Sequence, residues 1–531
     1  MRNLAIALIF GGKTMRKVME PQMTIGEVSI ADIEFDLRSR DEIPKILIGL
    51  QELYCDRSLR KNIFEALKGL TPENVSPNKG RKGMNLWTIL VLGVLRLVSN
   101  WDFDKLTEIA NNHITLRLLL GHSLFGKPFR YALQTVKDNI ALFTPEILDK
   151  INQIVVNHGH NIVFKTHEAE LKGSCDSFPV ETDVHFPTDI NLLLDALRKI
   201  IFLIMTLCKL HGITVWRKGM FNFREIKKLF TQISRMKHSS SKNKKKREER
   251  EQLIIKAHKL YLDLAQAIID KAEEALITIS LTDTDIITDL KIDEIYGYIA
   301  HAERQIDQIR RRVIKGETIP HHEKVFSIFE VHTKWICKGK AGVGQELGLN
   351  VCVVKDQHGF ILHYRVMEDE SDVLIAVPII RETKERFENF TSCSFDKGFH
   401  SPDNQKKLAE ILETVVLPRK GKLSAGNREI ENAEEFRETR RKHSAVESSI
   451  NALENHGLDR CPDHGIEGFK RYVGQAVLAR NIQILGHTVQ QKKLKKQQRL
   501  EKKQRLQLRK KKPEKQSPLK NKHYCQLCLI H

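Results

Sequence analysis

Three acidic side chains, Asp176, Asp396 and Glu447, stand in sequence patterns suited to metal-dependent cleavage of phosphodiester bonds. Asp176 lies inside a β-prone stretch, where a charge is costly without a partner such as a metal ion. Asp396 directly follows another such stretch, at the kind of strand end where α/β sheets present ligand groups. Glu447 lies in a helical pattern beside Val446 and Ile450, so its carboxylate can face a sheet. Two divalent ions about 4 Å apart, held by such carboxylates, can activate the attacking oxygen and stabilise the leaving oxygen.

The segments around these acids predict strands that first pair in a hairpin and then alternate with helices. Strands are predicted at residues 172–184, 325–336, 349–354, 360–366, 390–395 and 413–418, and helices at 372–387, 403–412 and 434–454. This order is typical of an α/β layer fold with a mixed sheet. Residues 187–322 interrupt it with two helical patterns whose apolar residues recur every three or four positions, which predicts a long helical hairpin.

The N-terminal part of the chain predicts short helices. Apolar patterns at residues 86–98, 103–110 and 116–120 indicate three helices with short turns, as in a helix-turn-helix bundle, although periodicity alone does not place a helix in a DNA groove. The expected domains are a helical and extended lead segment, an all-helical DNA-binding domain, a catalytic domain with a helical insertion, and a basic, disordered tail. Their respective boundaries are 1–79, 80–165, 166–490 with 187–322 inserted, and 491–531.

The three acids lie in blocks that resemble the catalytic blocks of bacterial insertion-sequence DDE transposases, in particular the ISNCY-like group. The blocks are residues 175–189 (CDSFPVETDVHFPTD), 395–401 (FDKGFHS) and 443–450 (HSAVESSI). Segments at 338–340, 344–354 and 456–461 are similar to those that flank the family's blocks, and residues 81–84 with the helices after them resemble its DNA-binding region. The resemblance extends over most of residues 25–490.

This resemblance implies an RNase H-like catalytic domain in which Asp176, Asp396 and Glu447 bind two Mg²⁺ or Mn²⁺ ions. It implies that the protein cuts the ends of an insertion sequence and that the freed 3′ hydroxyl then attacks target DNA in line. The implied partners are double-stranded DNA, as terminal inverted repeats and target, and a second copy of the chain in a homodimer on paired ends. Candidate DNA-contacting cations are Arg81, Lys82, Lys244, Lys245, Lys338, Lys340, Lys397, Arg440 and Arg441.

This chain departs from the family's pattern around the last acid. The family often has an Arg four residues before the Glu and a Lys seven residues after it, whereas this chain has His443 and Glu454. Phosphate contacts there would have to come from His443, from Arg440 and Arg441, or from elsewhere.

The first block also contains or adjoins rivals to Asp176. These are Asp183, Asp189 and Asp195, of which Asp189 precedes a helix and fits a capping or first-turn position. The long gap between Asp176 and Asp396 is explained by the insertion, because the entropy cost of closing a loop grows slowly with its length. The insertion could clamp DNA, protect a strand end or serve as scaffold.

The charge of the chain points to a polyanionic partner. Its 87 Lys and Arg against 67 Asp and Glu give a formal charge of +20, and residues 492–522 alone hold 15 Lys and Arg and two Glu. Such a segment cannot bury a core, so it either binds phosphates non-specifically or only solubilises the chain. A second basic run at residues 242–250 leads into the first helix of the predicted hairpin.

Membrane and secretory classes are disfavoured. No uncharged apolar run approaches the roughly 20 residues of a spanning helix, and residues 4–10 are followed by a poor cleavage site. Nine scattered cysteines favour a reducing, cytosolic compartment. The resemblance implies a bacterial cytoplasmic protein associated with the nucleoid. Cys525, Cys528 and His531 have zinc-compatible spacing, but no second spaced pair accompanies them.

Two other functions stay open. A metal nuclease of the same fold would hydrolyse DNA without joining strands, and sequence cannot distinguish it from a transposase. A catalytically silent DNA-binding derivative of a transposase is disfavoured because all three acids are present.

Overall fold

The computed structural model describes residues 14–15, 27–71, 81–123, 129–164, 170–281, 285–337 and 344–510. The chain divides into two compact units, one of residues 1–142, 150–169 and 478–531, and one of residues 143–149 and 170–477. Within the described ranges, no helix combines the length and apolar character needed to span a bilayer. The cysteines of the predicted zinc motif lie outside the described residues.

The first unit is helical, which confirms the predicted helical N-terminal region. Its helices are α2 (Glu42–Cys55), α3 (Arg57–Lys68), α4 (Leu86–Val98), α5 (Phe103–Asn112), α6 (Ile114–Leu119), α7 (Leu133–Ile140), most of α8 (Pro145–Val163) and most of α18 (Ile466–Lys510). Every residue of α4 is buried, as its nearly continuous apolar sequence predicts. The short strands β1 (Thr14–Met15) and β2 (Arg81–Lys82) pair in parallel.

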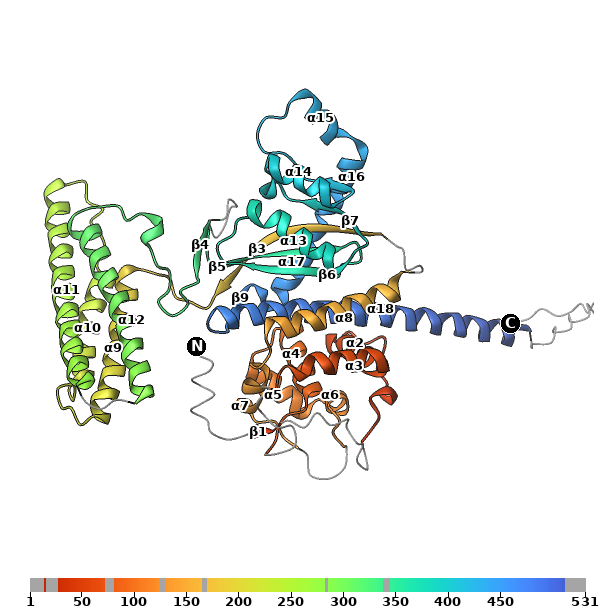
Figure 1. The fold of residues 1–531 in the computed structure, drawn as a ribbon, viewed down its shortest axis with the longest axis horizontal. Helices are drawn as coiled ribbons and strands as arrows, with labels where there is room; N and C mark the ends of the chain where they lie inside the picture. The colour runs from red at the N-terminus through yellow and green to blue at the C-terminus, as the bar shows by residue number, and fades with distance from the viewer. Residues whose placement is uncertain are drawn as a thin grey trace, which may run out of the picture. The chain divides into compact units, whose positions relative to one another are not determined.

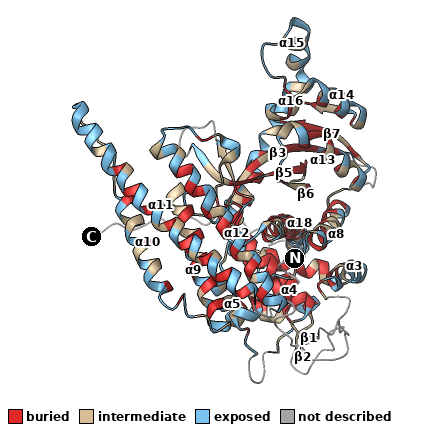
Figure 2. Cartoon of the chain, turned by 60° about the vertical axis from the view of Figure 1, so that its left-hand side comes forward, coloured by how far each residue is buried: buried red, intermediate tan, exposed pale blue. Residues whose placement is uncertain are grey.

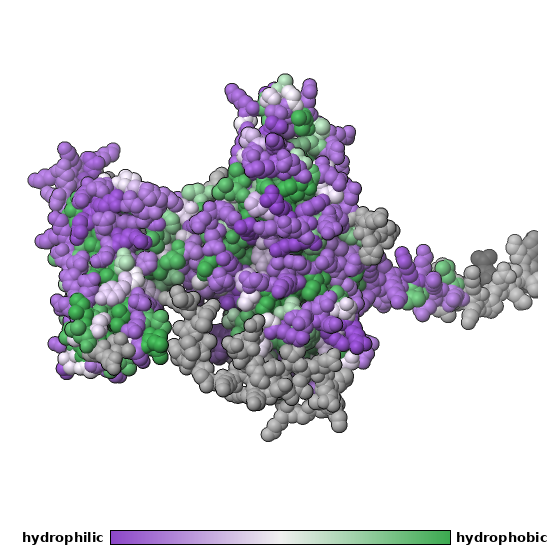
Figure 3. Space-filling view, in the orientation of Figure 1, coloured by the Kyte–Doolittle hydropathy of each residue, from purple (hydrophilic) through white to green (hydrophobic). Residues whose placement is uncertain are grey.

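Helix α18 extends into the segment that the sequence predicts to be a disordered tail. It continues through Lys510, so residues 491–510 are helical and only residues 511–531 lie outside the described part. Lys, Arg, Gln, Leu and Glu dominate this stretch, and all of them have high helix propensity. Figure 3 shows the described end of this helix covered largely with hydrophilic side chains.

The second unit is built on a mixed sheet of parallel and antiparallel strands (Figure 1), which confirms the predicted α/β class. In the described residues the sheet contains β3 (Leu171–Thr182), β4 (Lys334–Cys337), β5 (Gln345–Asp356), β6 (Ile361–Met367), β7 (Phe390–Phe395), β8 (Thr414–Val416) and β9 (Arg460–Cys461). The central order is β6-β5-β3-β7-β8, in which β5 is antiparallel to β3 and β6, while β7 and β8 are parallel to β3. This arrangement is consistent with an RNase H-like DDE domain.

Helices cover both faces of this sheet. Successive side chains of β3 alternate between the faces. Ser177 reaches α13 (Asp372–Arg386) on one face, whereas Lys355, which is paired with Ser174 of β3, reaches α17 (Ala445–Leu453) on the other. Figure 2 shows β3, β5 and β7 as mostly buried, whereas α15 (Ala425–Asn432) and α16 (Glu434–His443) are largely exposed.

The predicted helical insertion is present between β3 and β4. Its helices are α9 (Asp189–Leu210), α10 (Gly219–Ser234), α11 (Lys244–Ser280) and α12 (Ile286–Ile309), and they form one bundle around a continuous apolar core (Figure 1). Helices α11 and α12 are the predicted hairpin. The fully buried Tyr261 of α11 ties this bundle to the start of α9 by donating to the carbonyl oxygen of Ile190.

Two predicted elements differ from the structure. The strand predicted at 325–336 is reduced to β4, because the hydroxyl of Ser327 accepts the backbone N–H groups of Phe329 and Glu330 and bends the chain. The single helix predicted at 434–454 is two helices, α16 and α17, which meet at Ser444. The Ser444 hydroxyl donates to the carbonyl oxygen of Arg441 and closes the last turn of α16.

Candidate active site

Asp176 and Asp396 lie side by side where β7 ends. The last paired residues of the two parallel strands are Cys175 and Phe395, so the two aspartates are the next residues on β3 and β7. Beyond that point β7 turns away through η4 (Lys397–Phe399), and Asp396 caps this turn by accepting the backbone N–H of Gly398 at 3.5 Å. β3 continues beyond the end of β7, so the pairing of these two strands ends just before the two carboxylates.

Glu447 approaches the same edge from helix α17. Val446, Ser449, Ile450 and Leu453 are buried and orient the helix on the sheet, while Glu447 is exposed in its first turn. Burial raises the pKa of Asp176 to about 7, against the opposing hydrogen bond from the Ser177 amide, and the nearby charges of Asp396, Asp372 and Glu447 raise it further. The three predicted acids are therefore near enough for their charges to act on one another, and the charge of Asp372 acts with them.

Asp372, the first residue of α13, was not predicted from the sequence as a site residue. An acidic residue in the first turn of a helix is ordinary because it interacts well with the helix dipole, so sequence offers no signal for a further role. In the structure its Oδ1 accepts a hydrogen bond from the hydroxyl of Ser177 at 2.6 Å. Ser177 directly follows Asp176, and its backbone N–H donates to Oδ1 of Asp176 at 2.8 Å.

His443 occupies the position at which the family often has an arginine. Nδ1 of His443 lies 3.0 Å from the hydroxyl of Ser394, and the direction of this hydrogen bond depends on the tautomer of the imidazole. Nε2 of His443 is buried and has no hydrogen-bond partner among the described residues. Burial lowers the pKa of His443, while the charges of Asp396 and Glu447 oppose that shift.

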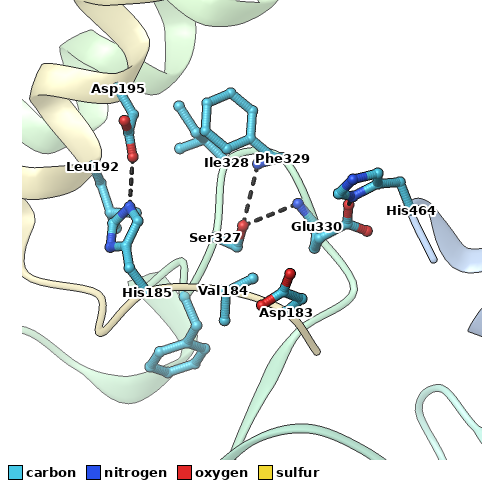
Figure 4. Close-up of a pocket in the computed structure, with 11 residues that line it drawn as sticks. Asp183, Val184, His185, Leu192, Asp195, Ser327, Ile328, Phe329, Glu330 and His464 are labelled. Atoms are coloured by element: carbon cyan, nitrogen blue, oxygen red, sulfur yellow. Dashed lines mark hydrogen bonds and ion pairs between the residues drawn. The ribbon is translucent and has the colours of Figure 1, made fainter. Parts of the chain in front are cut away.

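The rival acids of the first block interact with other side chains. Asp183 pairs with Arg460 at 2.9 Å, and Asp189, at the start of α9, pairs with Arg312 at 2.8 Å. Asp195 binds Nε2 of His185 at 2.6 Å. Figure 4 shows Asp183 and Asp195 around a small cavity of about 150 Å³, which Glu330 and His464 also line. Asp183 follows β3 directly, whereas Asp189 and Asp195 lie in α9, the first helix of the insertion.

The side chains at this edge offer ligand atoms that suit a divalent cation, but they do not form a complete ligand shell. Carboxylate oxygens are the ligands that Mg²⁺ prefers, and none of the four acids has an ion pair with a described lysine or arginine. Among the described residues, however, no three His, Cys, Asp or Glu side chains are placed to hold one metal ion.

The predicted DNA-contacting cations lie on several different elements. Lys397 is exposed beside Asp396, Arg440 and Arg441 are exposed on α16, and Lys244 and Lys245 are exposed at the start of α11. Arg81 and Lys82 form β2. Lys338 and Lys340 lie outside the described residues.

One family model overlaps this part of the chain. Residues 307–482 match the family model of the transposase DDE domain. This part of the chain is therefore similar to a transposase DDE domain, which confirms the predicted resemblance at this level; the ISNCY-like assignment stays a prediction. The matched range contains Asp372, Asp396 and Glu447, whereas Asp176 precedes it and is joined to it by the pairing of β3 with β5 and β7. Searches of curated proteins and of solved structures find no match.

Proposed function

We propose that this protein is an insertion-sequence transposase that cuts the element's ends and joins each freed 3′ hydroxyl to target DNA. The observation that carries the proposal is the meeting of Asp176, Asp396 and Glu447 at the end of β7, within and beside a transposase DDE domain. A DDE domain acts on DNA phosphodiesters, and the residues at this edge supply the hard oxygen ligands that such chemistry needs.

Asp176, Asp396 and Glu447 would hold two Mg²⁺ or Mn²⁺ ions. When bound, these ions activate the attacking oxygen and stabilise the leaving oxygen of an in-line displacement. The chain's own part is to fix the carboxylates: the end of β7 and its turn place Asp396, the overhanging β3 places Asp176, and the buried face of α17 directs Glu447.

Exposed cations would bind the DNA backbone around this edge. Lys397 adjoins Asp396, and Arg440 and Arg441 lie on the helix that leads to Glu447. Lys244 and Lys245 at the start of α11, and Arg81 and Lys82 of β2, would also contact DNA phosphates. Pairing of two element ends would require two copies of the chain, which is the reason for proposing a homodimer.

The test is a substitution series on cleavage of a DNA fragment that carries the native element end. Asp176→Asn and Glu447→Gln should each abolish cleavage while leaving DNA binding intact, because the cations supply affinity and the carboxylates hold metal. Asp183→Asn and Asp195→Asn are the matched controls and should still cleave. If a rival variant lost cleavage and Asp176→Asn kept it, the assignment of the first acid would be wrong.

A further inference from the structure

One end of each helix in the insertion bundle lies at a common tip. Residues 211–218 join α9 to α10, and residues 281–285 join α11 to α12. Hydrogen bonds from Thr288 lower the pKa of Asp285, and the nearby charge of His211 lowers it further, so the two connections lie close to each other. The bundle tip consists of residues 209–221, 277–281 and 285–290.

Large apolar side chains are exposed at the bundle tip. Ile277 and Leu281 at the end of α11 are 59% and 84% exposed, and Ile286 and Leu290 at the start of α12 are 78% and 50% exposed. The members of each pair are four residues apart, so they lie on one face of their helix. The tip also exposes Leu210, Val215, Met220, Phe221 and Ile287. Figure 3 shows hydrophobic side chains gathered at the lower end of this bundle. Single exposed apolar side chains are common on soluble proteins, but a contiguous group of them marks an interaction surface.

Opposite charges flank this apolar surface. Lys209, Arg217 and Lys218 are exposed where α9 ends and α10 begins. Asp285 and Asp289 are exposed where α12 begins. Helices α10 and α12 both pack on α9 and lie on opposite sides of it (Figure 1). The tip therefore has a basic side and an acidic side with apolar side chains between them.

This distribution of charge matches a second copy of the same tip. An interface about a two-fold axis pairs one surface with itself, so each residue meets its counterpart's neighbour in both directions. The basic side of one tip then faces the acidic side of the other, and the apolar side chains of the two tips meet between them. DNA is a poorer match, because its phosphates repel Asp285 and Asp289 and gain nothing from the apolar side chains.

We propose that the bundle tip is the surface through which two copies of this chain associate. The inference rests on the proposed function, because it names the surface that joins the two copies on paired element ends. It assigns to the helical insertion a part in assembly, with the exposed apolar side chains at the centre of the interface and the charges of Lys218 and Asp289 at its rim.

The experiment is sedimentation velocity of the full-length protein without DNA, over a series of protein concentrations. We expect the wild type to show a reversible equilibrium between monomer and dimer. A protein with both Leu281→Ser and Ile286→Ser should have a dimer dissociation constant about 10-fold higher or more, because the interface then buries less apolar area. Ile430→Ser on α15 is the matched control, since Ile430 is also exposed and its replacement should leave the dissociation constant unchanged.

Charge reversal tests how the two copies are paired. Lys218→Glu and Asp289→Lys should each weaken the dimer, because like charges then face each other across the interface. Both changes in one chain should restore the dimer, since the two-fold axis again places opposite charges against each other. Thermal unfolding of each variant shows that it is folded before its association is measured.

The outcomes separate this inference from the proposed function. The inference is overturned if the wild type stays monomeric at every concentration, or if the protein with Leu281→Ser and Ile286→Ser dimerises as the wild type does. A tip variant that loses DNA affinity but keeps its dimer would show that the tip binds DNA instead. Cleavage of a single element end measures the proposed function independently, so a wild type that dimerises through the tip without cleaving DNA would refute the proposed function and support the interface.

Discussion

The amino group of Lys355 donates a hydrogen bond to the carbonyl oxygen of Ala445 over 2.5 Å, two residues before Glu447. It also lies 3.3 Å from the hydroxyl of Ser449, two residues after Glu447, and only 8% of the lysine is exposed. These hydrogen bonds hold strand β5 against the buried face of α17. The rotation of that helix about its axis determines where the Glu447 carboxylate points.

Replacement of Lys355 should therefore harm catalysis more than folding. Lys355→Met keeps the side-chain volume but removes the hydrogen-bond donor to the Ala445 carbonyl oxygen and the Ser449 hydroxyl. This loss should lower the free energy of unfolding by about 1–3 kcal/mol. Cleavage by the folded protein should fall while DNA binding stays unchanged. Lys384→Met is the matched control, since Lys384 donates to the carbonyl oxygen of Phe390 away from α17. Equal loss of cleavage in both variants would show that Lys355 has no special part in placing Glu447.

The raised pKa of Asp176 makes the stability of the metal-free protein depend on pH. The unfolded carboxyl ionises near pH 4 and the folded one near 7, so the folded state binds more protons between these values and stability falls as pH rises. The fall is roughly 2–4 kcal/mol, because each pKa unit is equivalent to about 1.4 kcal/mol. Urea unfolding in chelator at pH 5 and pH 7.5 should show most of this loss in the wild type, but not in Asp176→Asn. The same loss in both proteins would mean that another group causes it.

Much of the fold could be predicted because its signals are local. The hairpin of β5 and β6, strand β7 and helix α13 follow from alternating or helical apolar patterns, and they lie within a few residues of the predicted bounds. The break at Ser444 was missed because one side-chain hydrogen bond to Arg441 decides it and the flanking apolar pattern does not. The contact between Asp372 and Ser177 was missed because the two residues lie far apart in sequence and come close only in the folded chain.

Two glycines in the first unit allow helices α2 and α18 to cross closely. A Cβ at Gly486 would lie only 2.0 Å from the carbonyl oxygen of Lys45, and one at Gly49 would lie 2.6 Å from that of Ile482. Gly49→Ala or Gly486→Ala should therefore lower the free energy of unfolding by about 1–3 kcal/mol, since backbone atoms cannot move aside cheaply. Gly297→Ala in α12 meets no atom within 4 Å and should be neutral or stabilising by about 0.5–1 kcal/mol. Denaturation curves of the three variants would decide this, and a stable Gly486→Ala protein would contradict the close crossing.

The basic end of α18 should contribute non-specific DNA affinity. Residues 492–507 are mostly exposed along the helix and carry many lysines and arginines. A chain ending at residue 491 should bind DNA more weakly, and the logarithm of its affinity should fall less steeply with the logarithm of salt concentration, by about 0.9 for each lost phosphate contact. Fluorescence anisotropy at several salt concentrations measures this slope. An unchanged slope would mean that this segment does not contact phosphates.

Joining of element ends to target DNA tests the central claim most directly. The full-length protein would be incubated with Mg²⁺, end-labelled DNA carrying the native element ends and an unlabelled target, beside the Asp396→Asn variant. We expect cleaved ends and labelled joined products from the wild type, and from Asp396→Asn only DNA binding. Cleavage without joined products would indicate a nuclease, and cleavage or joining by Asp396→Asn would contradict the assignment of the active site.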